Sequence, residues 1–165
     1  MEFRKATILD IPTIQAIAEE TWRPTYSHIL TEEQCIYMLD LMYNSATLQS
    51  QIDGRVSFFM VEEGGIALGY IAFEPISESL IKLHKIYFRP NQKKQGAGRL
   101  AIEFVKKQAS KLGARFIELN VNKYNSAVDF YLKMGFIQQK EMVLDIGNGY
   151  VMDDYVMQLD LAPVQ

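Results

Sequence analysis

The residues of this sequence most suited to chemistry stand between Lys93 and Arg99, where two glycines lie among basic side chains. Gly96 and Gly98 allow the backbone to approach a bulky ligand closely. If a helix begins there, its first N–H groups and the positive end of its dipole point at that ligand. Lys93, Lys94 and Arg99 add mobile positive charge. The segment therefore predicts a site that binds a pyrophosphate group.

The distribution of charge along the chain also favours an anion site in this segment. The 165 residues carry a net charge of −3, yet residues 82–107 hold eight basic residues against the single acid Glu103. Residues 1–81 carry a net charge of −8 and residues 108–165 one of −2. The negative charge of these two segments argues against a protein that coats nucleic acid. The alternative to an anion site is a basic face without a ligand.

Two common phosphate motifs do not describe the segment. No Gly-Lys-Ser/Thr follows the glycines, so the segment is not a P-loop. It also lacks the third glycine of a dinucleotide-binding fingerprint and falls in the middle of the chain. A metal site is not expected either, because the chain has two isolated histidines and one cysteine.

The elements that must position this segment follow from the periodicity of apolar residues and from the turn residues. The pattern predicts the order βααβββαβαββ in one α/β domain over residues 1–165, with a mixed sheet. The run from Leu80 to Val121 reads as a parallel strand–helix–strand crossover. The predicted strands are 2–7, 55–62, 66–74, 80–88, 115–121, 136–144 and 150–161. The predicted helices are 10–22, 31–43, a short one over 45–52, 98–112 and 126–134.

The composition bounds the class and compartment of the protein. A chain that is 48% apolar and 22% charged, with 10 glycines and 5 prolines, fits a globular domain of ordinary size. No apolar run is long enough to span a membrane, and no signal peptide is visible, so a cytoplasmic protein is expected. Cys35 cannot form an intrachain disulfide and is expected to be a small buried apolar residue.

Two blocks of the sequence resemble the GNAT family of N-acetyltransferases. The block 93–98, Lys-Lys-Gln-Gly-Ala-Gly, is similar to the Gln/Arg-x-x-Gly-x-Gly/Ala loop that binds acetyl-CoA, with Lys93 as the departure. The block from Asn125 to Phe136 is similar to the pattern Asn-x-x-Ala-x-x-Phe-Tyr-x-x-x-Gly-Phe. The order of elements agrees over almost the whole chain. Shorter pieces, such as Trp-Arg-Pro-Thr-Tyr, resemble the PaiA-like polyamine acetyltransferases.

The resemblance implies a GNAT acyltransferase fold with acetyl-CoA as cosubstrate. It places the pantetheine arm along the end of the 80–88 strand, with the thioester carbonyl near the N–H of Ile86. Asn125 either contacts the pantetheine or acts near the start of its helix. The residues implied in acetyl-CoA binding are Ile86, Tyr87, Phe88, Lys93, Lys94, Gln95, Gly96, Ala97, Gly98, Arg99 and Asn125.

The resemblance also implies catalytic roles. Tyr131 matches the family's general acid, which protonates the leaving thiolate; the alternative is a core aromatic residue on an amphipathic helix. His84 aligns with a histidine that relays a proton to water in some members, and imidazole titrates near neutral pH. The alternatives for the base are Glu118 or ordered water, and His84 would then only be satisfied within the sheet.

The acceptor side in this family lies near the first two helices. Trp22 and Tyr26 are therefore candidate substrate-binding residues, and a polyamine or another small cationic amine is the expected substrate. The alternative for these helices, whose nearby carboxylates are Glu19, Glu20, Glu32 and Glu33, is a solvated face with an aromatic residue packing the turn. The last two strands suggest a homodimer. Two other functions remain open: an acyl-CoA-binding sensor and a protein N-terminal acetyltransferase.

Overall fold

The structure is a computed structural model that describes residues 1–92 and 94–162. We use the name phosphate loop for residues 93–99, where the sequence predicts a pyrophosphate site; Lys93 of this loop lies outside the described residues. Contacts divide the chain into two compact units. The N-terminal unit comprises Met1–Glu74 and His84–Ala101, and the C-terminal unit comprises Pro75–Leu83 and Ile102–Gln165. One domain over 1–165 stays a prediction.

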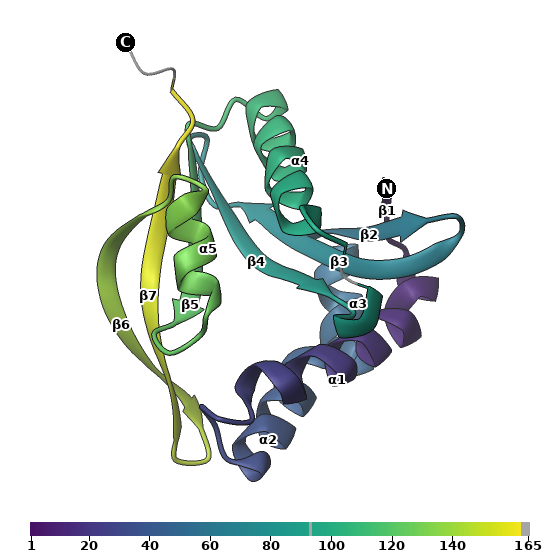
Figure 1. Cartoon of the computed structure of the whole chain (residues 1–165), viewed down its shortest axis with the longest axis vertical. Helices are drawn as coiled ribbons and strands as arrows, with labels where there is room; N and C mark the ends of the chain where they lie inside the picture. Colours follow the sequence, from purple (N-terminus) through teal and green to yellow (C-terminus); the bar gives the residue numbers. More distant parts are fainter. Residues whose placement is uncertain (93, 163–165) are drawn as a thin grey trace. The chain divides into compact units, whose positions relative to one another are not determined.

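The sheet is mixed, as the sequence predicts, with the strand order β1-β2-β3-β4-β5-β7-β6 (Figure 1). β4 and β5 pair in parallel from Leu80↔Phe116 to Leu83↔Leu119, whereas β1–β2, β2–β3, β5–β7 and β6–β7 are antiparallel. The strands are β1 (Glu2–Lys5), β2 (Ser57–Glu63), β3 (Ile66–Pro75), β4 (Leu80–Phe88), β5 (Phe116–Asn122), β6 (Ile137–Gly147) and β7 (Tyr150–Asp160). The predicted order is confirmed for the strands, and the short helix expected over 45–52 adds a third helix between β1 and β2.

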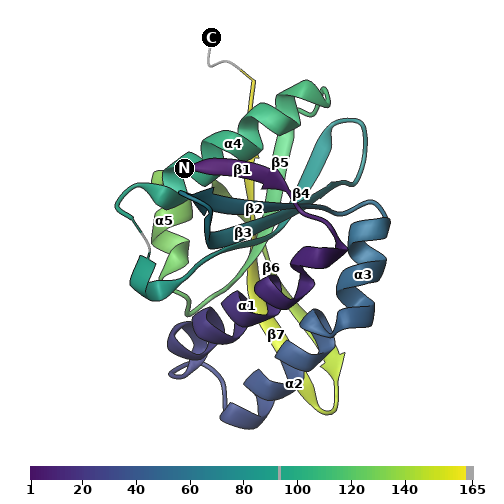
Figure 2. The same ribbon diagram turned by 90° about the vertical axis from the view of Figure 1, so that its right-hand side faces the viewer.

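The helices of the described residues are α1 (Ile11–Tyr26), α2 (Glu32–Tyr43), α3 (Ser45–Asp53), α4 (Ala97–Lys111) and α5 (Ala127–Lys133), with short 3-10 turns at Ile8–Asp10 and Pro90–Gln92. In the N-terminal unit α1 packs beside α2 and α3 (Figure 2). In the C-terminal unit α5 packs on β5. No helix in the described part of the chain is long and apolar enough to cross a membrane.

Helix α1 continues past Arg23-Pro24, where the sequence predicts its end. A proline inside a helix costs about 3 kcal/mol, because it removes one backbone hydrogen bond and crowds the preceding turn. Trp22 and Tyr26 are 3% and 9% exposed, and they lie four residues apart on one face of α1. Burying two aromatic side chains, each with a large apolar area, offsets that cost. The continuation places Tyr26 on the same helix face as Trp22.

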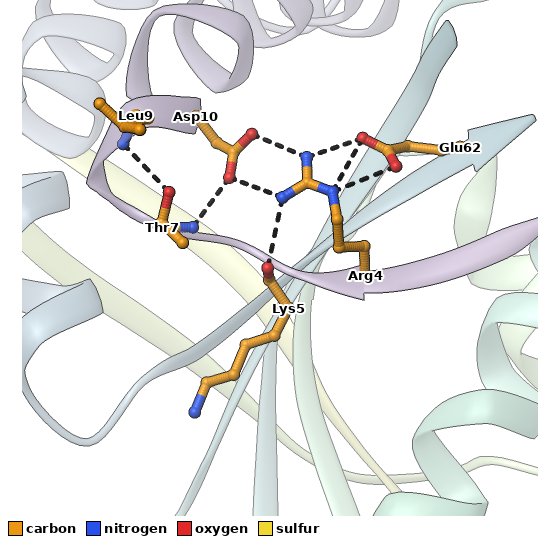
Figure 3. Close-up of polar contacts among 6 residues, drawn as sticks. All are labelled: Arg4, Lys5, Thr7, Leu9, Asp10 and Glu62. Carbon is orange, nitrogen blue, oxygen red and sulfur yellow. Dashed lines mark hydrogen bonds and ion pairs between the residues drawn. The ribbon is translucent and has the colours of Figure 1, made fainter. Parts of the chain in front are cut away.

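The start of α1 is held by an ion-pair cluster around Arg4 (Figure 3). Arg4 Nη2 lies 2.9 Å from Asp10 Oδ1 and 2.7 Å from Glu62 Oε1. Asp10 makes no side-chain cap bond to α1; its carboxylate accepts from the Thr7 N–H at 2.8 Å. The hydrogen bond from Arg4 holds the pKa of Asp10 below its usual range. The cluster thus joins β1, β2 and the turn before α1. Asp10, the first residue of the predicted 10–22 helix, precedes α1 and does not cap it with its side chain.

Candidate active site

The loop between β4 and α4 has the backbone that a phosphate site needs. Gly96 is exposed with φ +82°, and a Cβ there would meet no atom within 4 Å. Ala97, the first residue of α4, is 1% exposed, so the start of the helix is packed against the protein interior. The Leu100 N–H donates to the Gly96 carbonyl at 3.0 Å, so the N–H groups of Gly98 and Arg99 precede this first helical hydrogen bond. Residues 94–99 therefore fit an anion with backbone donors.

Several cations of residues 82–107 already have carboxylate partners. Lys94 pairs with Glu63 and Arg89 pairs with Glu20. Arg99 and Gln95 are exposed in the same loop. Because Lys94 and Arg89 are partly neutralised by the fold, the local charge that an anion meets is smaller than the sequence count suggests.

The C-terminal half of β4 lies tightly against β3. A Cβ on Gly69 would stand 2.3 Å from the carbonyl oxygen of Tyr87 and 2.9 Å from a ring carbon of Phe88. The Arg89 N–H donates to the Leu68 carbonyl at 2.8 Å. Only glycine fits where the two strands approach so closely, and it keeps β3 against the strand for which the family resemblance implies pantetheine binding. Ile86 and Tyr87 are half-buried there.

His84 forms a dyad that the sequence analysis missed. His84 Nε2 lies 2.7 Å from Glu74 Oε1, and the two side chains are 35% and 24% exposed. Glu74 ends β3 and His84 follows the turn into β4, so the antiparallel register of this β-hairpin was the signal that could have revealed the pair. A carboxylate on one ring nitrogen orients the imidazole and leaves the other nitrogen for a second partner. The role of His84 as a base stays a prediction.

We expect the His84–Glu74 dyad to behave as one unit if it carries protons. His84→Gln then lowers kcat of acetyl transfer by about 100-fold, the usual scale for a lost acid–base group. Glu74→Gln lowers kcat by about tenfold, since the ring loses its orienting partner. Steady-state kinetics of the two single variants and the double variant measure the coupling. Equal and additive small effects from both variants would contradict the dyad.

Glu118, the competing candidate for the base, is engaged elsewhere. Lys82 Nζ lies 2.8 Å from Glu118 Oε1 and also donates to the Asn120 side chain. Asp154 on β7, which is not among the predicted candidates, is 3% exposed in the same unit as Glu118. Burial raises the pKa of Asp154 to about 6. Asp154 stands between Asp153 and Tyr155, and this local sequence gives no signal that its side chain is buried.

Helix α5 holds Tyr131 and the block that precedes it. Tyr131 is 8% exposed, and its ring lies edge-on to Phe130 and Phe136 at centroid distances of 5.3 and 5.5 Å. Tyr131 is buried whereas Phe130 is half-exposed, so the ring of Tyr131 packs in the core of this unit. Asn125 Oδ1 accepts from the Ala127 N–H at 2.9 Å, so Asn125 acts at the start of the helix. Its contact with pantetheine stays a prediction.

The two candidate acceptor residues belong to a buried aromatic cluster in the N-terminal unit. Trp22 lies 4.8 Å from Tyr26 and 6.3 Å from Tyr87 between ring centroids. The hydroxyl groups of Tyr26 and Tyr87 are 3.5 Å apart. We use the name aromatic cluster for Trp22, Tyr26, Tyr43, Tyr70 and Tyr87, which α1, α2, β3 and β4 supply.

The carboxylates of α1 and α2 do not line this cluster as free acids. Arg23 pairs with Glu32 at 3.0 Å and with Glu19 at 3.9 Å. Glu20 pairs with Arg89, and Glu33 is exposed. Because these carboxylates are exposed or paired with arginines, they agree with the alternative prediction that this side of α1 and α2 is a solvated helix face.

Cys35 lies in α2 beside a separate cavity of about 330 Å³. The cavity is lined partly by Leu30, Ile36 and Leu39. Cys35 is 8% exposed, and burial raises the pKa of its thiol. The thiol is therefore unsuited to nucleophilic catalysis. Among the described residues, no group of three His, Cys, Asp or Glu side chains could hold a metal ion.

The sequence profile described as "Acetyltransferase (GNAT) domain" matches residues 28–158. A curated relative, the spermidine N(1)-acetyltransferase of Thermoplasma acidophilum, is 27% identical over 142 residues, which is 82% of this chain and 88% of the relative.

Solved structures share the fold. The crystal structure of the PaiA N-acetyltransferase from Thermoplasma acidophilum, in complex with coenzyme A, is similar with a TM-score of 0.83 and 24% identity, and covers 96% of this chain and 98% of that one. A GNAT protein from Rhodopseudomonas palustris has a TM-score of 0.82 at 17% identity, with 96% and 94% coverage. These matches confirm the predicted resemblance to GNAT proteins and, among them, to PaiA-like ones.

Proposed function

We propose that this chain, which belongs to the GNAT family of acetyltransferases and is an acetyl-CoA-dependent N-acetyltransferase, uses a small alkylamine of the polyamine class as its acceptor. The aromatic cluster is the observation that carries the choice of acceptor. Several electron-rich rings converge in the N-terminal unit, and the faces of such rings attract alkylammonium groups. The similarity to a spermidine acetyltransferase supports the same class.

The residues of the phosphate loop fit the pyrophosphate of coenzyme A. Gly96 leaves open space where another residue would carry a side chain, and the N–H groups of Gly98 and Arg99 precede the first hydrogen bond of α4. Exposed Gln95 and Arg99 add side-chain donors. When bound, acetyl-CoA supplies an acetyl group activated as a thioester. We assign the loop to phosphate binding and the backbone of Ile86 and Phe88 to the pantetheine amides.

Proton transfer completes the proposed reaction. The acceptor must lose its ammonium proton before it can attack, and the His84–Glu74 dyad is our candidate for taking that proton. Tyr131 is our candidate for the proton that the leaving sulfur needs. Neither role requires a covalent intermediate on the protein, and the pKa of the Cys35 thiol is raised by burial, which fits direct transfer.

The test is a screen of amines with the purified full chain and acetyl-CoA. Free thiol release and the mass of each amine are measured with spermidine, spermine, amino acids and a peptide with a free N-terminus. We expect spermidine or spermine to gain one acetyl group. Acetylation confined to the peptide would replace this acceptor by a protein N-terminus, and acetyl-CoA binding without any acetylated amine would point to a sensor.

A further inference from the structure

The proposed reaction leaves one side chain of the N-terminal unit unexplained. Lys85 is 9% exposed, and its Nζ lies 4.4 Å from the centroid of the Tyr43 ring. Within residues 1–92 and 94–162, its ammonium has neither an ion pair nor a hydrogen bond. Other lysines of the chain do have carboxylate partners: Lys82, Lys94, Lys106 and Lys123.

A buried ammonium without an anion favours loss of its proton. Transfer of the charge out of water is costly, and the neutral amine avoids that cost. Burial lowers the pKa of Lys85 to about 8, and desolvation is the cause. Near physiological pH the neutral-amine share of Lys85 is therefore larger than that of an exposed lysine. A neutral amine is the nucleophilic form.

The side chain of Lys85 is also chemically similar to the proposed acceptor. A lysine side chain is a 4-aminobutyl group, and spermidine carries an aminobutyl arm. Lys85 Nζ stands over the face of Tyr43, and the Tyr70 hydroxyl donates to the Tyr43 hydroxyl at 2.6 Å. Tyr70 and Trp22 in turn lie 5.8 and 6.3 Å from Tyr87 between ring centroids. The aromatic cluster therefore already holds an alkylamine, and this amine belongs to the protein.

Lys85 directly precedes Ile86, the residue whose N–H we assign to the thioester carbonyl. Their Cα atoms are about 3.8 Å apart, as in any trans peptide. If the proposed function holds, the acetyl group is therefore delivered beside the backbone of Lys85, whose ammonium lies over the Tyr43 ring of the aromatic cluster.

We propose that Lys85 is an internal acetyl acceptor, which this enzyme acetylates from acetyl-CoA when no external amine is bound. The inference rests on the proposed function. In the step, neutral Lys85 Nζ forms a bond to the carbonyl carbon, and the bond from that carbon to sulfur breaks. Nζ loses one proton and the thiolate gains one, so the products are N-acetyl-Lys85 and coenzyme A with a free thiol.

The experiment compares two acetyl donors on the full chain without added amine. Acetyl-CoA is expected to modify Lys85 faster than the exposed Lys107, on the order of tenfold or more, because the acetyl group is held beside it. N-hydroxysuccinimidyl acetate acetylates lysines according to their exposure to solvent. With this reagent, Lys107 is expected to be modified faster than Lys85. Peptide mass mapping measures both sites, and thiol release with acetyl-CoA should stop near one equivalent per chain.

Two further arms keep the inference distinct from the proposed function. Saturating spermidine is expected to suppress acetylation of Lys85, and K85R is expected to lose the early thiol release while K107R keeps it. If spermidine is acetylated but Lys85 stays unmodified without it, the internal acceptor is wrong and the proposed function stands. If acetyl-CoA labels Lys85 no faster than it does in the urea-unfolded chain, the modification is only chemical. If neither spermidine nor Lys85 is acetylated, both ideas fail.

Discussion

Replacing Tyr131 by phenylalanine is expected to lower kcat of acetyl transfer by about 100-fold or more, the scale of a lost general acid. The substitution removes one hydroxyl group and keeps the ring. Because the ring of Tyr131 packs edge-on against Phe130 and Phe136, those contacts survive in Tyr131→Phe. Steady-state kinetics with acetyl-CoA and spermidine measure the effect, and thermal unfolding checks that the fold is unchanged.

A second tyrosine provides the control for this variant. Tyr124 lies just before α5 and is 71% exposed, so Tyr124→Phe removes a hydroxyl group from the same region without touching the core. We expect Tyr124→Phe to keep kcat within about twofold, as for surface changes that alter stability by less than about 0.5 kcal/mol. Equal kcat values for the two variants would remove Tyr131 from the reaction.

The second large effect is expected at Gly69, where alanine should lower the free energy of unfolding by about 2–3 kcal/mol. The added Cβ would stand 2.3 Å from the carbonyl oxygen of Tyr87, which is backbone and cannot rotate away. Strands β3 and β4 must then separate locally. Since Ile86 and Phe88 lie on that part of β4, the apparent KM for acetyl-CoA should rise as well. Urea unfolding and initial-rate kinetics measure the two changes.

Gly65→Ala separates this steric effect from the general cost of replacing a glycine. Gly65 has φ +79°, and a Cβ there meets no atom within 4 Å. Its conformational cost is about 1 kcal/mol, without a change in KM. A Gly69→Ala variant as stable as Gly65→Ala would mean that β4 yields at this point and does not form a rigid support.

Much of the fold follows from local sequence signals that the tertiary structure does not override. Gly64-Gly65 predicts the hairpin between β2 and β3, and both residues have positive φ. Thr31 predicts the start of α2, and its side chain accepts from the Gln34 N–H at 3.2 Å. Gly113 follows α4 with φ +76°, as a helix-ending glycine should. These positions need only their neighbours in sequence to adopt the observed backbone.

Other features depend on contacts between residues that are distant in sequence, and the local sequence pattern does not predict such contacts. Helix α1 passes Pro24 because Trp22 and Tyr26 are buried against other elements. The Asp10 carboxylate accepts a hydrogen bond from Arg4 and does not cap α1, and Arg4 also pairs with Glu62 on β2. Lys85 reads as one of many cations in its segment, and only its packing over Tyr43 shows that it is buried.

The candidate site divides in the same way. The glycines of the phosphate loop and the block around Tyr131 are recognisable from type and spacing. The partner of His84 is not, because Glu74 becomes its neighbour only through the register of two strands. The partners of Glu20 and Glu118 likewise come from side-chain directions that a linear pattern does not contain.

The aromatic cluster also gives the protein a built-in optical reporter. Trp22 is the only tryptophan of the chain, and it lies among Tyr26, Tyr43 and Tyr87. Excitation selective for indole therefore reads the polarity and rigidity of this one location without any label. If an amine binds at the aromatic cluster, the fluorescence of Trp22 is expected to follow its arrival in real time, and the fluorescence lifetime is expected to change when the Lys85 side chain is displaced.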